Sequence, residues 1–202
     1  MVVSGKHKTT LNKMKTVIEK FETLISQLDK KSQEFYHSSI LTEEHPKNKI
    51  LVEEGKVCKY SYIVLEGCIR KFYLKDGIEI TSEFIFPGEM AVSFGSFLKR
   101  KPSNEFIQTI ENTKVMLIPF SVFEFMQKEH TSILQTNFDV LVDYSQWLEN
   151  RLYHLQFHTA KERYLILLNS QPEIIQRIPL MYIASYLGIT LETLSRIRSQ
   201  II

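Results

Sequence analysis

The sequence has little cysteine and no long apolar run, and each absence removes a class of protein. Cys58 and Cys68 are its only cysteines, too few for a four-thiolate iron–sulfur cluster or a cysteine-only zinc site. We interpret them as reduced residues of a β-rich region, with a redox-sensing pair as the alternative. No apolar stretch approaches about 18 residues, the length of a membrane span, and the polar start does not resemble a signal peptide. We therefore expect a cytoplasmic protein with no membrane partner.

The net charge is also small. The chain carries 25 Lys and Arg residues against 23 Asp and Glu residues, a formal net charge of +2 at pH 7. Because such a molecule is no polycation, any nucleic-acid binding has to come from a local surface. Residues 161–202 hold five Lys and Arg, three Glu and no Asp, and this segment charge of +2 favours DNA binding only weakly.

The run Ile178–Gln200 has the pattern of a helix-turn-helix. Pro179 suits the first helical turn because its missing N–H would have no partner there, and Ile183 and Leu187 recur one turn apart. Ala184 is small enough for a second helix to cross closely over the first. These residues predict the first helix of the motif and its inward face.

The turn and the second helix follow from the next residues. Gly188 ends the first helix, since glycine adopts the left-handed conformation of a tight C-cap at little steric cost. Thr190 is the N-cap of a second helix that carries Leu194 and Ile197 inward. An ordinary helical hairpin is the alternative, but it does not require a small residue four positions before the glycine. The pattern therefore favours the DNA-binding motif.

The outward residues of this second helix are candidate DNA contacts. Arg196 lies one turn beyond Glu192, so both side chains can enter one major groove. There arginine can donate two hydrogen bonds to guanine, and glutamate can accept one from cytosine N4. Arg198 and Ser199 are candidate phosphate contacts. The full predicted set is Thr190, Leu191, Glu192, Thr193, Ser195, Arg196, Arg198 and Ser199.

A β-rich region precedes the helical end of the chain. Between about Lys49 and Pro119, short runs rich in β-branched and aromatic residues alternate with turn residues. Asp76-Gly77 is a strong hairpin signal, since both turn residues need a positive φ. Such spacing predicts a jelly roll or a small barrel. The expected strands are 50–52, 60–65, 68–74, 78–86, 106–110 and 115–118.

Helices are predicted on both sides of the β-rich region. Residues 14–28 form an amphipathic pattern in which Val17, Ile18, Phe21, Leu24, Ile25 and Leu28 share one stripe. From His130 to about Gln156 there is no Pro or Gly, and a further helix over 159–168 is broken by 169–172. The long helix carries a narrow seam typical of a parallel coiled-coil dimer, with one polar position. Its members are Leu134, Phe138, Leu141, Ser145, Leu148, Leu152 and Leu155.

The order of helix, β-roll, long helix and helix-turn-helix resembles the cyclic-AMP receptor and Fnr (Crp/Fnr) family of transcription regulators. The resembling residues are Glu54-Gly55 through Glu66-Gly67, Phe86-Pro87-Gly88-Glu89 and, most specifically, Gly188 through Arg196. The resemblance implies an α+β fold and a homodimer whose β-roll senses a small molecule and whose helices read a palindrome in double-stranded DNA. It makes RNA polymerase and an unidentified effector further candidate partners.

Three domains follow from this organisation. Residues 1–130 are the N-terminal helix and a cyclic-nucleotide-binding-like β-roll, 131–157 the dimerisation helix, and 158–202 the helix-turn-helix domain. The resemblance assigns the base contacts to Glu192 and Arg196, and places Leu191 where many relatives carry a second arginine. We therefore expect an apolar contact there, to a thymine methyl.

The sensor region departs from the cyclic-AMP-binding members. Where those members place a Gly-Glu-Leu turn and an Arg-Ser/Thr pair, this chain has residues 91–94 and 102–105, without the phosphate arginine. Leu148 and Glu149 replace the Thr-Ser pair that holds the adenine. A cyclic phosphate needs a bidentate cation or several backbone donors, so we expect no binding of cyclic AMP. The candidate effector pocket consists of Glu89, Ser93, Ser103, Asn104 and Leu148.

Enzyme function is disfavoured. A cupin-like metalloenzyme is one alternative for a β-roll, but its metal centre needs two or three histidines from neighbouring strands, and the predicted strands contain none. His154, His158 and Glu162 have helical metal-ligand spacing, yet we read them as a solvated helix face. We therefore expect no catalytic residues, no metal and no cofactor. A small-ligand-binding β-roll without DNA output is the other alternative, and the helix-turn-helix disfavours it.

Overall fold

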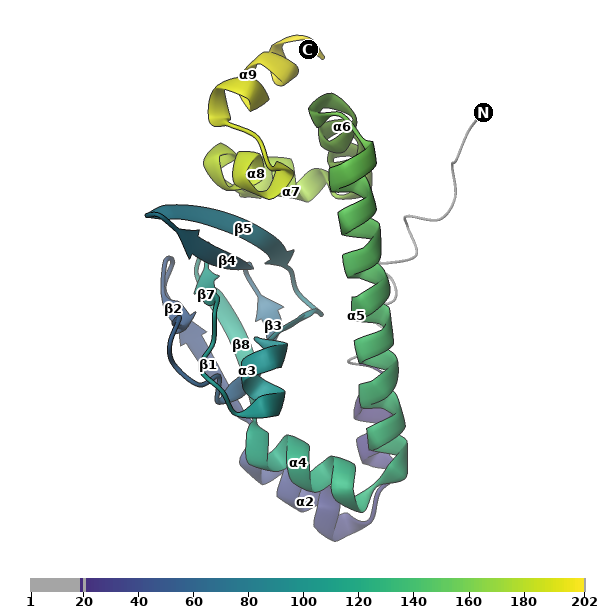
Figure 1. Ribbon diagram of the computed structural model, residues 1–202. Coiled ribbons are helices and arrows are strands. Elements are labelled where there is room, and N and C mark those ends of the chain that lie inside the picture. Colours follow the sequence, from purple (N-terminus) through teal and green to yellow (C-terminus); the bar gives the residue numbers. More distant parts are fainter. Residues whose placement is uncertain (1–18, 20, 202) are drawn as a thin grey trace, which may run out of the picture. The chain divides into compact units, whose positions relative to one another are not determined.

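The computed structural model describes residue 19 and residues 21–201 (Figure 1). The stripe residues Val17 and Ile18 predicted for the N-terminal helix lie outside this part of the chain. The described residues form two compact units. The first contains the residues up to Lys71 together with Phe84–Val142, and the second contains Phe72–Glu83 and the residues from Asp143 onward. No helix in the described ranges has the length and apolar character needed to cross a membrane.

Two antiparallel four-stranded sheets form the β-roll. One has the strand order β1 (Leu41–His45), β8 (Thr113–Pro119), β3 (Tyr60–Glu66) and β6 (Met90–Ala91). The other has the order β2 (Ile50–Val52), β7 (Phe106–Thr109), β4 (Ile69–Lys75) and β5 (Ile78–Ile85). All six predicted strands are confirmed with small changes at their ends. Strands β1 and β6 were not predicted.

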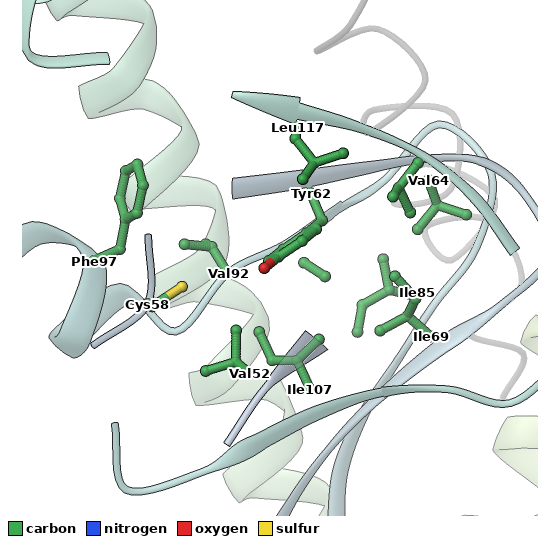
Figure 2. Close-up of a cluster of buried hydrophobic side chains, with 12 residues drawn as sticks. Val52, Cys58, Tyr62, Val64, Ile69, Ile85, Val92, Phe97, Ile107 and Leu117 are labelled. Carbon is green, nitrogen blue, oxygen red and sulfur yellow. The ribbon is translucent and has the colours of Figure 1, made fainter. Parts of the chain in front are cut away.

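An apolar core fills the space inside the roll (Figure 2). On β3 the register pairs Tyr62 with Leu117 and Val64 with Val115, and all four side chains belong to this core. Because successive strand residues point to opposite faces, the alternation of apolar residues predicts such packing. The complete buried cluster is Val52, Cys58, Tyr62, Val64, Ile69, Ile85, Ala91, Val92, Phe97, Ile107, Val115 and Leu117.

The helices of the first unit were only partly predicted. Residues 21–26 are helical, and Phe21, Leu24, Ile25 and Leu28 pack into a second apolar cluster as the stripe pattern predicts. Three short helices were missed: α2 (Lys30–Ser39), α3 (Phe94–Lys99) and α4 (Phe120–Glu129). Asp29 caps α2 by accepting hydrogen bonds from the backbone N–H and hydroxyl of Ser32, and these bonds lower the pKa of its carboxyl.

Glycine is required at two turns of the roll. The predicted Asp76-Gly77 hairpin is confirmed, since both residues have positive φ, 52° and 80°. At Gly67, with φ of 90°, a Cβ atom would lie 2.6 Å from Asn112 O and from Thr113 Oγ1. The strand ends at this turn can therefore approach only because no side chain stands between them.

The second unit combines the tip of the β4–β5 hairpin with the C-terminal helices. The long helix α5 (Thr131–Phe157) is confirmed over 27 residues and continues from the first unit. It is followed by α6 (Ala160–Ser170), α7 (Pro172–Arg177), α8 (Leu180–Leu187) and α9 (Leu191–Ser199). The predicted break over 169–172 is narrower, because α6 extends to Ser170 and Pro172 begins α7.

One side chain joins the hairpin tip to α8. The hydroxyl of Ser185 accepts a hydrogen bond from the backbone N–H of Thr81 at 2.9 Å and donates one to the carbonyl of Glu79 at 2.8 Å. The hairpin thereby contacts the first helix of the helix-turn-helix through backbone groups of β5 itself.

Candidate functional site

The turn of the helix-turn-helix has the predicted geometry. Gly188 has φ of 67° and ends α8 in a Schellman motif. The motif consists of two hydrogen bonds, from Gly188 N–H to Ser185 O and from Ile189 N–H to Ala184 O, each 3.0 Å long. Pro179 stands one position earlier than predicted, as the N-cap residue and not within the first turn. Its extended ψ of 135° explains the shift, because a helical residue needs a negative ψ.

Helix α9 starts at the predicted cap. The hydroxyl of Thr190 accepts a hydrogen bond from the backbone N–H of Thr193 at 3.2 Å. Leu194 and Ile197 are buried, and Ala184 on α8 is buried as well. The inward side of the motif is therefore the apolar side that the spacing predicts, and the opposite side of α9 faces solvent.

Six of the eight predicted DNA contacts are exposed. These are Thr190, Leu191, Glu192, Ser195, Arg196 and Ser199, whereas Thr193 and Arg198 are half-buried. Thr193 Oγ1 lies 3.1 Å from Thr190 Oγ1 and accepts a long, 3.5 Å hydrogen bond from Arg196. The pKa of the Glu192 carboxyl is lowered by its own backbone N–H, then by the Thr190 hydroxyl and by the charge of Arg196. Glu192 is thus ionised at neutral pH and available as an acceptor.

Two arginines missed in the sequence support the end of α8. Arg151 donates to the carbonyl of Tyr186 and lies over its ring, 3.7 Å from the centroid. Arg163 donates through Nε to the carbonyl of Leu187 at 3.0 Å. Cations beside the last carbonyls of a helix satisfy them and favour its dipole. Both side chains therefore help to orient the turn before α9, and only their positive charge was visible in the sequence.

The coiled-coil seam is uncovered in the single chain. All seven predicted members, Leu134, Phe138, Leu141, Ser145, Leu148, Leu152 and Leu155, are exposed. The leucines keep 38 to 54% of their surface accessible, and Phe138 keeps 59%. An apolar stripe of this length on one helix is an unusual surface for a monomer.

The segment over residues 93–105, which includes α3 and which we call the cassette loop, brings two predicted pocket residues together. Ser93 and Ser103 are buried, and their hydroxyl oxygens lie 3.1 Å apart. The hydroxyl of Ser103 also donates to the carbonyl of Glu105 and accepts from its N–H. Beside them, Lys71 Nζ lies 3.6 Å from Glu105 Oε2, with 5% and 7% of these side chains exposed. We call Lys71, Ser93, Ser103 and Glu105 the polar cluster.

The only arginine of the cassette loop is held by structural contacts. Arg100 Nη1 donates to the carbonyls of Cys58 and Phe97 at 2.8 and 3.3 Å, and its guanidinium lies over the ring of Phe120. Ser96 accepts from the N–H of Cys58 and donates to the Lys101 carbonyl. The polar side chains of the loop therefore bond to its own backbone, at Phe97 and Lys101, and to the backbone of Cys58 outside it.

The remaining predicted pocket residues are not brought together. Glu89 accepts a hydrogen bond from the N–H of Phe86, and Asn104 is exposed. Leu148 belongs to the second unit. Lys71 and Glu105 were not predicted. The sequence of the cassette loop lacks the expected phosphate arginine, and a lysine in a strand gives no signal that it is buried beside that loop.

Other candidate sites have structural roles. Nδ1 of His154 and His158 lie 3.4 Å apart, but Glu162 accepts from both the N–H and the hydroxyl of Thr159 in a capping box. The six predicted strands contain no histidine, and the one histidine in any strand that the structure describes is His45, on the unpredicted strand β1. Across residues 21–201 the structure brings no three potential metal ligands together. Cys58 and Cys68 are buried thiols, and burial raises the pKa of Cys58.

Known proteins share parts of this sequence and most of this fold. A family model described as cyclic nucleotide-binding domain matches residues 42–130. A regulator of the Crp/Fnr family from Eubacterium rectale superposes with a TM-score of 0.71 at 18% identity, covering 85% of this chain and 82% of that one. FixK2 from Bradyrhizobium japonicum gives 0.68 at 23%, covering 80% and 83%. The c-di-GMP responsive regulator CLP from Xanthomonas campestris gives 0.62 at 17%, covering 86% and 91%.

No curated protein sequence matches the chain significantly. The structural matches nevertheless cover more than three quarters of both chains in each of these three cases. Residues 42–130 therefore match the model of a cyclic nucleotide-binding domain, and the chain shares, over most of its length, the fold of these Crp/Fnr-type structures.

Proposed function

We propose that the protein is a homodimeric transcription regulator that reads a palindromic DNA site with helix α9. The observation that carries the proposal is the two-sided character of this helix: Leu194 and Ile197 are buried, while Glu192 and Arg196 are exposed one turn apart. A helix held by its apolar side and presenting a charged acceptor and a charged donor on the other suits the major groove.

The half-sites follow from the dimer. Two copies of α9 related by a two-fold axis contact two half-sites about 34 Å apart, which is about one turn of duplex DNA. We expect selection from random duplexes with the purified protein to recover an inverted repeat with this spacing. Recovery of a site without two-fold symmetry would contradict the dimer part of the proposal.

Arg196 is expected to read a base. Replacing Arg196 with alanine should cost about 1 to 3 kcal/mol of binding free energy on the selected site and relax the choice at one base pair, because two hydrogen bonds to guanine are lost. Binding is measured on the selected site and on a scrambled duplex across a salt series. Equal losses on the two duplexes would show that Arg196 reads no base.

Arg198 is the matched control for this measurement. It lies on the same helix, is half-buried, and has the position of a phosphate contact. Arg198→Ala should weaken binding to both duplexes alike and lower the salt slope by about one unit, because one phosphate contact and its released counterion are lost.

We further propose that the β-roll does not sense cyclic AMP. The cassette loop meets a cyclic phosphate with a carboxylate, Glu105, and its one arginine, Arg100, is committed to carbonyls and a ring. The hydroxyls of Ser93 and Ser103 are bonded to each other. A phosphate placed there would break these bonds and would have to compete with the Glu105 carboxylate for Lys71, the cation of the polar cluster, which already lies 3.6 Å from that carboxylate.

Calorimetry tests this part of the proposal. Titration with cyclic AMP should give no binding heat at micromolar concentration, since each lost charged contact removes about 1.5 to 3 kcal/mol. Binding of the same preparation to its selected DNA site shows that the protein is folded. A micromolar dissociation constant for cyclic AMP would refute the proposal for the β-roll and leave the DNA-binding part untouched.

A further inference from the structure

We propose that His154 and His158 form a two-ligand site for a first-row transition-metal ion such as Zn²⁺, at the junction of α5 and α6. Nδ1 atoms of the two rings lie 3.4 Å apart, and the ring centroids lie 4.9 Å apart. His154 belongs to the last turn of α5, and His158 stands between the end of this helix and Thr159, the N-cap of α6. Both histidines belong to the second unit, so the site lies within one compact part of the chain.

The distance between the two nitrogens distinguishes metal ligands from a hydrogen-bonded pair. Hydrogen bonds donated by N–H groups span about 2.7 to 3.2 Å, so 3.4 Å is long for a bond between two imidazoles. Two nitrogens that each lie about 2.0 to 2.1 Å from a zinc ion, at a tetrahedral angle, are about 3.3 to 3.4 Å apart. A spacing of four residues is also typical of a solvated helix face. The two facing Nδ1 atoms are what the structure adds, and they have the separation that a shared ion needs.

Neighbouring groups orient the two imidazoles. The Tyr153 ring meets the His154 and His158 rings edge-on, at centroid distances of 5.8 and 5.5 Å, and it stacks on Phe157 at 4.8 Å. The backbone N–H of His158 donates to the carbonyl of His154 at 3.3 Å, and Arg163 Nη1 donates to the carbonyl of His158 at 2.6 Å. Ligands that their neighbours already orient lose less freedom when an ion binds.

The surroundings of the pair suit a partly hydrated cation. The pKa of the Glu162 carboxyl is lowered by the N–H and hydroxyl of Thr159 and then by the charge of His158, so this carboxylate lies near the pair. Because it is committed to the cap of α6, it supplies a nearby negative charge and not a third ligand. Both histidines are half-buried, so water can fill the remaining positions of the ion. Imidazole ligands suit Zn²⁺, Ni²⁺ or Cu²⁺, whereas Mg²⁺ and Ca²⁺ prefer oxygen ligands.

A bound ion would connect two successive helices. His154 belongs to α5, whereas His158 directly precedes the cap of α6, so ligation would fix the last turn of the long helix to the start of the C-terminal helices. An ion that binds the folded chain and not the unfolded chain stabilises the fold by mass action. We therefore expect Zn²⁺ to raise the melting temperature of the full chain. An effect on DNA affinity rests on the proposed function, whereas metal binding itself does not.

Isothermal titration of the full chain without a histidine tag tests the site, with Zn²⁺ as the probe. The expected result is one ion per chain, bound more weakly at about pH 5 than at about pH 7, because protons compete for both imidazoles. No binding heat at submillimolar Zn²⁺, or equal affinity at the two pH values, would overturn the site. One ion for two chains would also overturn it, since the ligands would then come from two copies.

Single variants locate the ion. His154→Gln and His158→Gln should each weaken Zn²⁺ binding at least about tenfold, since even the loss of a group that orients a metal ligand costs about 10- to 100-fold. His37→Gln is the matched control, because His37 is exposed on α2 in the first unit, and it should leave the titration unchanged. Retained binding in His154→Gln or in His158→Gln would overturn the proposal.

Histidine NMR of the unaltered chain gives a second readout that does not depend on how the variants fold. Zn²⁺ should shift the ring resonances of two of the six histidines and leave the other four in place. Shifts in a different number of rings would refute the pair as the site. Neither measurement involves DNA, so failure of the metal site and failure of the proposed function are distinguishable.

Discussion

Leu148→Asp is expected to convert the proposed dimer into monomers at micromolar protein concentration. In a symmetric coiled coil each copy of Leu148 packs near its mate, so the substitution buries two like charges without partners. A buried uncompensated charge costs about 3 to 5 kcal/mol, which raises the dissociation constant about 10²- to 10³-fold or more. Sedimentation equilibrium of both proteins over a concentration series measures the change.

Two further substitutions on α5 control for this effect. Gln146→Asp places the same charge at an exposed position next to the seam, and it should leave the dimer intact. Ser145→Leu should strengthen the dimer, because it replaces the one polar member of the seam by an apolar side chain. If Leu148→Asp remained dimeric at the same concentrations as Gln146→Asp, the seam would not be the interface.

Glu105→Ala should destabilise the protein more than alanine substitution of any other member of the polar cluster. It removes the carboxylate 3.6 Å from Lys71 Nζ and leaves the ammonium buried, where 5% of its side chain is exposed. Breaking a buried ion pair costs about 3 to 5 kcal/mol, and we expect the lower value because Lys71 has further interactions. Urea unfolding of the full chain gives this difference as a lowered midpoint at unchanged slope.

The double variant Lys71→Met with Glu105→Leu separates the loss of the ion pair from the burial of an unpaired charge. It removes both charges, so most of the lost stability should return, since apolar side chains of similar size can replace a buried pair at little cost. Glu44→Ala is the surface control: it breaks the exposed Lys114–Glu44 pair, 3.4 Å long, and should cost less than about 1 kcal/mol. If Glu105→Ala cost no more than Glu44→Ala, the buried pair would contribute nothing to the fold.

The helix-turn-helix was predictable because its determinants are local. Gly188 must supply a positive φ and Thr190 must supply a cap, and both requirements depend on residues within one turn of the chain. The one error, the place of Pro179, amounts to a single position. Strand β3 was predictable from its composition, since its run of aromatic and β-branched residues is typical of a strand, and Ser61–Val64 within it are buried.

The missed elements are stabilised by distant residues. Strand β1 reads Leu-Thr-Glu-Glu-His, and only its last residue escapes full exposure, so no alternation marks it. It forms because β8 offers an unpaired edge more than 60 residues later, with Leu41 opposite Leu117. Helix α2 has one buried residue, Ser32, and therefore lacks an apolar stripe; only its cap, Asp29, was a local signal.

The polar cluster was predicted less well than the helix-turn-helix for a physical reason. Ser93 and Ser103 were found because they replace a known pattern, but Lys71 lies on a strand where a lysine usually faces solvent. Its partner Glu105 is 34 residues away and reaches it only when β4 and the cassette loop pack together. No periodicity or spacing encodes such a contact.

The hydroxyl of Ser185 has a consequence for aggregation. Strand β5 is the last strand of its sheet, and an edge strand offers free N–H and C=O groups to the strands of other molecules. Ser185 occupies one group of each kind, at Thr81 and Glu79, across sequence separations of 104 and 106 residues. During synthesis this edge stays open until α8 has been made, because contacts so distant in sequence form late. Ser185 therefore occupies two backbone groups of an edge strand that the nascent chain contains before α8 has been made.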